Sequence, residues 1–365
     1  KNTGNLLPLE RKGRIALIGP MADARNNMCG MWSMTCTPSR HATLLEGLRS
    51  AVGEEAEILY AKGSNIYYDE NLERGAVGIR PLERGDNQQL LDDALRTALR
   101  ADIIVAALGE CAEMSGESAS RTELGIPDAQ RDLLKALVKT GKPVVLLLFT
   151  GRPLVLNWEN EHIHSILNVW FGGSETGDAI ADVLFGKITP SGKLTTTFPR
   201  SVGQLPLFYN HLNTGRPDSD SNVFNRYSSN YLDISNEPLY PFGYGLSYTN
   251  FIYGDMRLSS DTLSANGKLT VSVTVSNKGD YDGYETVQLY LHDVYAEIAR
   301  PVKELKGFKR VFLKKGESCD VQFVITTADL KFYNSELKYV YEPGEFEVMV
   351  GPNSRDVQIK CFKAE

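Results

Sequence analysis

The chain has 365 residues, of which 42% are hydrophobic and 23% are charged, a balance typical of a folded globular protein that excludes disorder throughout. Lys and Arg number 39 against 46 Asp and Glu, and the net charge of −7 argues against a nucleic-acid-binding protein, which usually has a basic face. No apolar run reaches the roughly 20 residues of a membrane-spanning helix.

The first 200 residues alternate short apolar runs with amphipathic stretches. Apolar runs predict strands at residues 14–19, 57–60, 101–108, 144–149 and 164–171. Apolar residues at helical spacing predict helices at residues 43–50, 86–98, 127–138 and 174–184. This alternation predicts an α/β domain with a doubly wound, mostly parallel sheet, because parallel strands need crossover connections. We place this domain at residues 1–200.

The composition changes near residue 200, where Pro, Gly, Asn and Tyr become frequent and periodicity is weak. We predict an ordered aromatic connector over residues 201–250, because so many aromatic side chains need a surface on which to pack. Apolar and polar residues then alternate, for example at residues 269–275 and 345–350. About seven short strands without helices predict an all-β, fibronectin type III-like or immunoglobulin-like sandwich over residues 251–365.

Cysteine and histidine usage predicts neither a metal site nor a cofactor. The cysteines lack CxxC spacing and the five histidines are scattered, so we cannot assemble a set of metal ligands. Cys29 and Cys36 are close enough to pair in an oxidising compartment, and the sequence leaves their state open.

Nucleotide-binding motifs are also missing from the sequence. The first predicted strand ends without the G-x-G-x-x-G of a dinucleotide site, and no Walker lysine loop occurs. Thr-Gly-Arg-Pro occurs at 150–153 and at 214–217, which we interpret as coincidence.

The segment after the third predicted strand is unusually long, running over residues 109–127. Ligands of doubly wound sheets bind beyond the carboxyl ends of the strands, and long loops there are often functional. This loop contains Glu110, Glu113, Glu117 and Arg121 among small residues. Two interpretations stay open: a carboxylic acid presented for general acid–base chemistry, or a solvated acidic loop neutralised by its arginine.

A second loop, at residues 29–34, contains Trp32 beside glycine and serine. A tryptophan in such a loop can stack on a sugar ring, and it can equally be a buried core residue. The sequence alone does not separate these two interpretations.

Motifs along nearly the whole chain belong to one known pattern. They are Asn-Leu-Leu-Pro-Leu at 5–9, Ile-Gly-Pro at 18–20, Gly-Glu…Ser-Gly-Glu…Ser-Arg…Ile-Pro…Gln at 109–130, Gly-Lys-Leu…Phe-Pro-Arg at 192–200, Tyr-Pro-Phe-Gly-Tyr-Gly-Leu-Ser-Tyr-Thr at 240–249, Arg-Pro-Val-Lys-Glu-Leu-Lys-Gly-Phe at 300–308 and Glu-Pro-Gly-Glu-Phe at 342–346. By these motifs the chain resembles the carboxyl-terminal half of glycoside hydrolase family 3, in particular the bacterial periplasmic β-glucosidases.

The resemblance implies a retaining mechanism, in which a nucleophile forms a glycosyl-enzyme and one acid/base serves both steps. It places the Asp nucleophile in a Ser-Asp-aromatic motif on an amino-terminal (β/α)8 barrel. Here Ser219-Asp220 and Ser260-Asp261 lack the aromatic residue, and no Lys-His pair of the barrel's sugar clamp occurs. The chain also opens at Lys1 without Met or a signal peptide. We therefore expect that the barrel is absent from this chain, which is a truncated portion of a longer enzyme.

The resemblance assigns the acid/base to Glu117, with Glu113 as the competing candidate. Glu110 ends a strand and is expected to be structural, and Arg121 is expected to support the loop. A partly desolvated glutamate has a raised pKa that suits proton donation near neutral pH, and we expect Glu117 to lose this tuning without the barrel. Trp32 matches a tryptophan that flanks the leaving-group sugar in the family.

The resemblance thus implies the carboxyl-terminal portion of a retaining β-glucosidase that hydrolyses terminal β-D-glucosyl residues and is inactive by itself. Its expected partners are a β-glucoside or oligosaccharide substrate and the barrel domain of the same enzyme, with no nucleic acid. The resemblance implies a periplasmic or secreted location. The alternative is a non-catalytic carbohydrate-binding or scaffolding module on the same fold.

Overall fold

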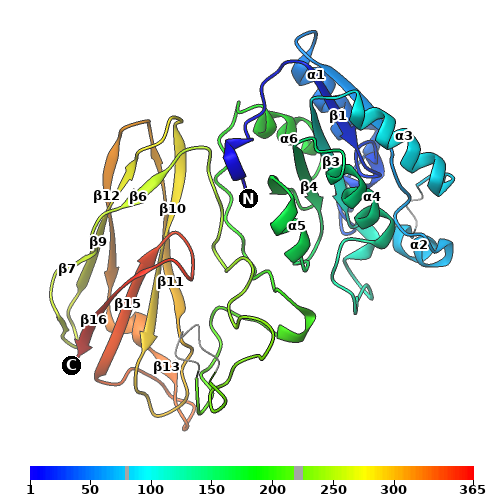
Figure 1. Cartoon of the computed structure of the whole chain (residues 1–365). Coiled ribbons are helices and arrows are strands. Elements are labelled where there is room, and N and C mark those ends of the chain that lie inside the picture. The colour runs from blue at the N-terminus through cyan, green and yellow to red at the C-terminus, as the bar shows by residue number, and fades with distance from the viewer. Residues whose placement is uncertain (79–81, 218–224) are drawn as a thin grey trace. The chain divides into compact units, whose positions relative to one another are not determined.

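A computed structural model describes residues 1–78, 82–217 and 225–365 (Figure 1). The chain divides into two compact units, Lys1–Ile188 and Thr189–Glu365. The first contains the α/β domain and the second the β-sandwich, and each is described by itself below. The residue boundaries predicted for the domain, the connector and the sandwich stay predictions.

In the described part of the first unit, five strands form one parallel sheet in the order β2-β1-β3-β4-β5. They are β1 (Arg14–Ile18), β2 (Glu57–Ala61), β3 (Ile103–Gly109), β4 (Val144–Phe149) and β5 (Ser165–Asn168). All six residues of β4 are buried, because both faces of a central parallel strand are covered. The predicted doubly wound parallel sheet is therefore confirmed. The strand order reverses between β1 and β3, which is where ligands bind in such sheets.

Helices connect these strands (Figure 1). They are α1 (Leu44–Val52), α2 (Glu70–Val77), α3 (Asn87–Leu99), α4 (Asp128–Val138), α5 (Asn157–His162) and α6 (Thr176–Leu184). Helix α1 begins with a capping box, in which the Thr43 hydroxyl accepts from the Glu46 N–H and the Glu46 carboxylate accepts from the Thr43 N–H. The helix predicted over residues 174–184 begins two residues later, at Thr176. None of the helices in the described ranges is both long and apolar enough to cross a membrane.

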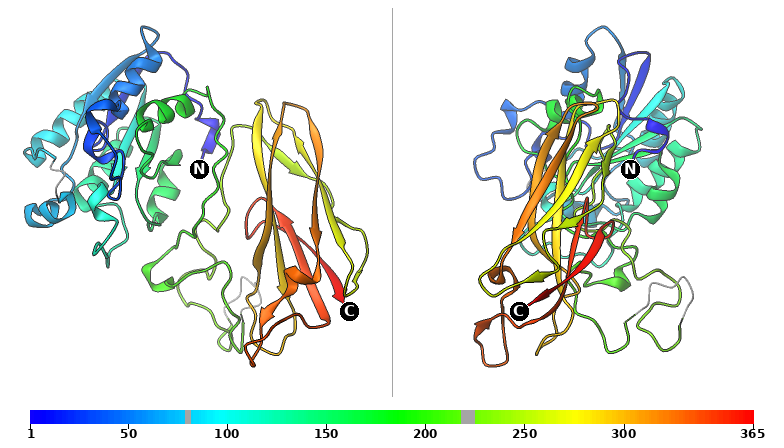
Figure 2. Two further views of the ribbon diagram at one scale, coloured as in Figure 1. Left: turned by 180° about the vertical axis from the view of Figure 1, so that it is seen from behind. Right: turned by 90° about the vertical axis from the view of Figure 1, so that its left-hand side faces the viewer.

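The second unit is a two-layer β-sandwich (Figure 1; Figure 2). In its described residues one sheet runs β11-β10-β15-β16-β8 and the other β12-β9-β6, with β7 also paired to β9. These strands are β6 (Phe251–Tyr253), β7 (Arg257–Leu258), β8 (Thr262–Leu263), β9 (Leu269–Asn277), β10 (Gly283–Asp293), β11 (Glu304–Leu313), β12 (Ser318–Ile325), β15 (Gly344–Gly351) and β16 (Gln358–Ala364), beside the short pair β13 (Phe332–Tyr333) and β14 (Tyr339–Val340). Buried residues alternate along β9, which confirms the predicted sandwich.

Aromatic residues in and just before the predicted connector pack within this second unit. Phe198 is buried, and its backbone pairs with that of Tyr240. The ring of Tyr209 stacks on Phe242 with centroids 4.3 Å apart and meets the edge of Tyr290, a residue of β10, at 5.7 Å. These described aromatic side chains therefore pack on one another and on β10.

One buried acidic side chain, Asp293, makes the stability of the sandwich unit depend on pH. Asp293 is buried at the end of β10, and its Oδ2 has no hydrogen-bond partner. Burial raises the pKa of Asp293 from its ordinary value of 3.8 to about 6, although the nearby Arg300 opposes the shift. The folded state then keeps a proton that the unfolded state has lost between about pH 4 and pH 6. The free energy of unfolding therefore falls as the pH rises through this window.

Asp293→Asn removes this charge and preserves the size of the side chain. We expect it to raise the Tm of the sandwich transition at pH 7.5 by roughly 2–4 °C, the shift that about 1 kcal/mol produces in a unit of this size. At pH 3.5 the folded wild type has a neutral Asp293 and the variant a neutral asparagine, so their unfolding transitions should coincide. Thermal unfolding at both pH values checks this, with the exposed Asp255→Asn as the control. An equal gain at both pH values would show that the charge of Asp293 is not the cause.

Candidate functional site

Two strands of the α/β unit end in glycines that let neighbouring backbones approach closely. Gly109, at the end of β3, has φ +132°, and a Cβ there would lie 1.9 Å from the carbonyl oxygen of Phe149. Gly19, which follows β1, has φ +139°, and a Cβ there would lie 2.1 Å from the carbonyl oxygen of Ala107. Only glycine fits these positions. The loops that follow β1, β3 and β4 therefore begin side by side at the carboxyl edge of the sheet.

Glu110, the first residue after β3, is a fully buried carboxylate. The Arg121 Nη1 donates to its Oε1 at 2.8 Å, while the Thr150 hydroxyl and the Gly151 N–H donate to its Oε2 at 2.8 and 3.1 Å. Buried charges persist when they are paired and hydrogen-bonded in this way. These contacts tie the start of the long loop to a residue near its end and to the turn after β4.

Two other groups near this carboxylate stay neutral at physiological pH. Burial raises the pKa of the Cys111 thiol, and the negative charges of Glu73 and Glu110 raise it further. Burial also raises the pKa of the Tyr67 hydroxyl, with Arg121 opposing part of the shift. The local charge therefore comes from Glu110, Glu73 and the basic side chains around them.

The base of the long loop is also held by α4 and by the segment after β1. The side-chain amide of Gln130 is buried; it donates to the Gly109 carbonyl at 2.9 Å and accepts from the Gly109 N–H at 2.8 Å. The Ala112 N–H donates to the Asn27 side-chain oxygen at 2.9 Å. The loop thus leaves β3 along a path fixed by side-chain hydrogen bonds.

The two candidate acid/base glutamates lie in different surroundings. Glu117 is exposed at the outer part of the loop, after Gly116, whose φ of +145° favours glycine. Glu113 is half-buried in a 3-10 turn, Ala112–Met114, and its side chain packs on Gly78, where a Cβ would lie 3.0 Å from the Glu113 Cγ. Glu117 is therefore open to solvent, while Glu113 faces the end of α2.

The loop with Trp32, residues 29–34 (the tryptophan loop), lies against the long loop of residues 109–127 (the acidic loop). A Cβ on Gly116 would lie 2.2 Å from the Met31 Sδ, so the two loops touch at that point. Trp32 is the next residue after Met31, as Glu117 is after Gly116. The Trp32 side chain is 63% exposed, which excludes the buried core position that the sequence left open. The structure thus brings an exposed aromatic ring and an exposed carboxylate onto neighbouring loops.

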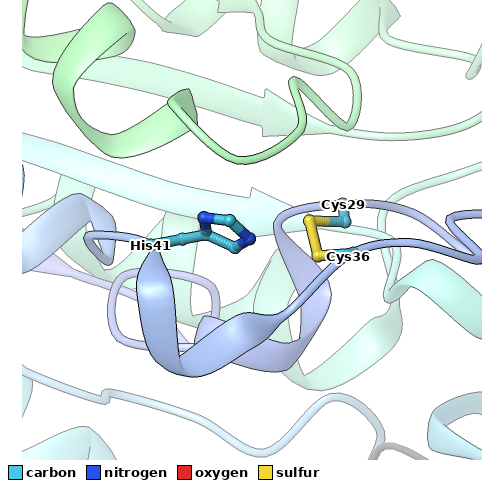
Figure 3. Close-up of side chains that lie close together, drawn as sticks. All are labelled: Cys29, Cys36 and His41. Carbon is cyan, nitrogen blue, oxygen red and sulfur yellow. A yellow bond between two sulfur atoms is a disulfide. The ribbon is translucent and has the colours of Figure 1, made fainter.

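A disulfide between Cys29 and Cys36 closes the tryptophan loop. Figure 3 shows the imidazole ring of His41 beside this disulfide, and its Nε2 is buried without a hydrogen-bond partner. One ring nitrogen of His41 and the two sulfurs lie within 4.8 Å of one another, the spacing of potential metal ligands. Sulfurs that are bonded to each other have no thiolate to offer a metal, and no other such cluster occurs among the described residues.

The structure does not bring every predicted residue to this edge. Ser260-Asp261 lies in the sandwich unit, just before β8, and Ser219-Asp220 lies outside the described residues.

Arg152 is a residue of this site that the sequence did not single out. It pairs with Glu110, with its Nε 3.1 Å from the Glu110 Oε1. It belongs to the Thr-Gly-Arg-Pro segment at 150–153. The signal that could have found it is its position directly after β4, the neighbour of β3.

Comparison with known proteins covers most of the chain. Residues 1–248 match the model of the glycosyl hydrolase family 3 C-terminal domain, and residues 285–354 match a fibronectin type III-like domain. The chain is 48% identical over 369 residues to a periplasmic beta-glucosidase of Salmonella typhimurium, covering 100% of the chain and 48% of the relative. It is 39% identical to a beta-xylosidase of Formosa agariphila, covering 99% of the chain and 47% of the relative.

A solved structure shows the same arrangement of elements. The chain superposes on a beta-glucosidase from Listeria innocua in complex with isofagomine with a TM-score of 0.87 and 39% identity, covering 100% of this chain and 48% of that one. The chain therefore spans about half the length of these relatives.

Proposed function

The chain belongs to glycosyl hydrolase family 3, and on that premise we propose that it is the carboxyl-terminal portion of a retaining β-glucosidase whose general acid/base is Glu117. The nucleophile is an aspartate of a barrel domain that these residues do not include. The substrates are terminal β-D-glucosides or oligosaccharides, and the location is periplasmic or secreted, as the name of the Salmonella relative suggests.

One observation supports this assignment above the others, the contact between the Met31 and Gly116 segments. It holds Trp32 and Glu117 on neighbouring loops, both exposed. A glycosidase acid must reach the oxygen between two sugars, so a ring that stacks on the leaving-group sugar belongs beside it. Glu113 is the weaker candidate, because its side chain packs on Gly78.

In the two steps Glu117 performs opposite proton transfers. It first protonates the glycosidic oxygen as the aspartate nucleophile attacks the anomeric carbon, and the leaving-group sugar departs. The resulting carboxylate then takes a proton from water as that water attacks the glycosyl-enzyme.

Hydrolysis of two substrates by the full-length enzyme tests the proposal. The leaving group of cellobiose is a sugar, while that of β-glucosyl fluoride is a fluoride ion, on which no aromatic ring can stack. We expect the enzyme to release glucose from both, and Trp32→Ala to lower kcat/KM for cellobiose about 10-fold, the loss expected for about 1.4 kcal/mol of stacking, while that for β-glucosyl fluoride stays within about 2-fold. Trp158→Ala, on α5, is the matched control. Absence of glucose release by the wild type would contradict the function, and equal losses on both substrates would contradict the role of Trp32.

A further inference from the structure

Arg152 contacts the acidic loop on both sides of Glu117. Its Nη2 donates to the Ala119 carbonyl at 2.7 Å, two residues after Glu117, and also to the Met114 carbonyl, three residues before it. The stretch between these two carbonyls contains neither helix nor strand. One guanidinium group therefore closes the short segment that presents the glutamate.

Arg121 holds the later part of the same loop. Its Nη1 donates to Glu110 Oε1 at 2.8 Å, and its Nη2 donates to the Gly125 carbonyl at 3.0 Å. Its side chain is only 13% exposed. Both arginines thus join loop carbonyls to a single buried carboxylate that is itself fixed to the turn after β4.

The chemistry of these groups suits a rigid support. Guanidinium groups present several donors in one plane, and charge-assisted hydrogen bonds are about twice as strong as neutral ones. Glu110 is fully buried, so its pairing with the arginines is little screened by water or salt. An unsupported loop would otherwise lose backbone conformational entropy when it adopts one conformation as the substrate binds.

From these contacts we propose that Glu110, Arg121 and Arg152 form a buried clamp that positions the acid/base carboxyl of Glu117. The inference rests on the proposed role of Glu117. Within this clamp Arg152 and Arg121 are positioning residues, which contact the loop backbone and not the substrate. A displacement of about 1 Å at a catalytic group can cost about 10²-fold in rate, so loosening the clamp slows the steps that need proton transfer.

Variants of Arg152 in the full-length enzyme separate positioning from a general loss of structure. We expect Arg152→Met to lower kcat/KM for cellobiose about 30-fold, while kcat/KM for 2,4-dinitrophenyl β-glucoside, whose leaving group needs no protonation, falls less than about 3-fold. Arg152→Lys keeps the charge opposite Glu110 and should recover part of the loss. The exposed Arg49→Met on α1 is the matched control, and thermal unfolding verifies that each variant is folded.

Combining variants shows whether the clamp acts through Glu117. In the double variant Glu117→Gln/Arg152→Met, kcat/KM for cellobiose should equal that of Glu117→Gln alone, because no acid remains to be positioned. Equal losses of Arg152→Met on both substrates, or losses that multiply in the double variant, would overturn the clamp. If Glu117→Gln itself shows no dependence on the leaving group, the proposed function fails instead, so the two failures are distinguishable.

Discussion

Replacing Glu117 by Gln in the full-length enzyme is expected to lower kcat/KM for cellobiose about 10³-fold. Glutamine cannot donate a proton to the glycosidic oxygen, and general acid–base catalysis contributes roughly 10²–10⁴-fold in such steps. For 2,4-dinitrophenyl β-glucoside the same ratio should fall less than about 10-fold, because dinitrophenolate leaves without protonation. Steady-state kinetics with a series of aryl glucosides of graded leaving-group pKa measures the difference directly.

The control for this prediction is Glu113→Gln. Glu113 packs on Gly78 at the end of α2, so its replacement should change both substrates by less than about 3-fold. A steep dependence on the leaving group in Glu113→Gln, with a flat one in Glu117→Gln, would move the acid/base to Glu113. Identical losses on all substrates in Glu117→Gln would show that the glutamate is structural.

The 365-residue chain alone is expected to give no sustained hydrolysis of p-nitrophenyl β-glucoside. A retaining glycosidase needs two carboxyl groups about 5–5.5 Å apart, one on each side of the scissile bond. In the proposed function Glu117 supplies one, and neither Ser219-Asp220 nor Ser260-Asp261 has the aromatic residue of the family's nucleophile motif. The full-length enzyme at the same concentration should turn over many times, so the expected difference is a complete loss.

Release of p-nitrophenolate at each time point, compared with the full-length enzyme, checks this. Sustained turnover by the chain alone would contradict the division of the two carboxyl groups between domains. Calorimetry with cellobiose on the same sample tests the alternative of a carbohydrate-binding module. Binding in the micromolar range by the chain alone would favour that module, while no detectable heat fits a subsite completed by the barrel.

The longer strands β4 and β9 were predictable because one is a continuous apolar run and the other a clear alternation. Residues 144–149 are all apolar because β4 is buried on both faces. Residues 269–275 alternate apolar residues with Thr or Ser because β9 is buried on one face. Helices α2 and α5 were missed, because both are short and rich in polar residues, and α2 depends on its Asp69 cap, whose carboxylate accepts from the Asn71 and Leu72 N–H groups.

The candidate site was only partly predictable. Glu117 and Trp32 were assigned through the resemblance of their loops to family motifs, but the contact that joins the loops runs through Met31 and Gly116, which carry no chemical signal of their own. Arg152 lies 33 residues from Ala119, and its role depends on the pairing of β3 with β4, which periodicity does not reveal. The Cys29–Cys36 disulfide likewise needed the folded loop.

Azide rescue of glycine variants tests the central claim, that Glu117 is the acid/base, most directly. In Glu117→Gly the glycosyl-enzyme forms from 2,4-dinitrophenyl β-glucoside but lacks a base to activate water, so azide, which needs none, should restore turnover and yield β-glucosyl azide. Glu113→Gly should show no such rescue. Rescue of Glu113→Gly with none in Glu117→Gly, or an α-glucosyl azide product from Glu117→Gly, would contradict the assignment.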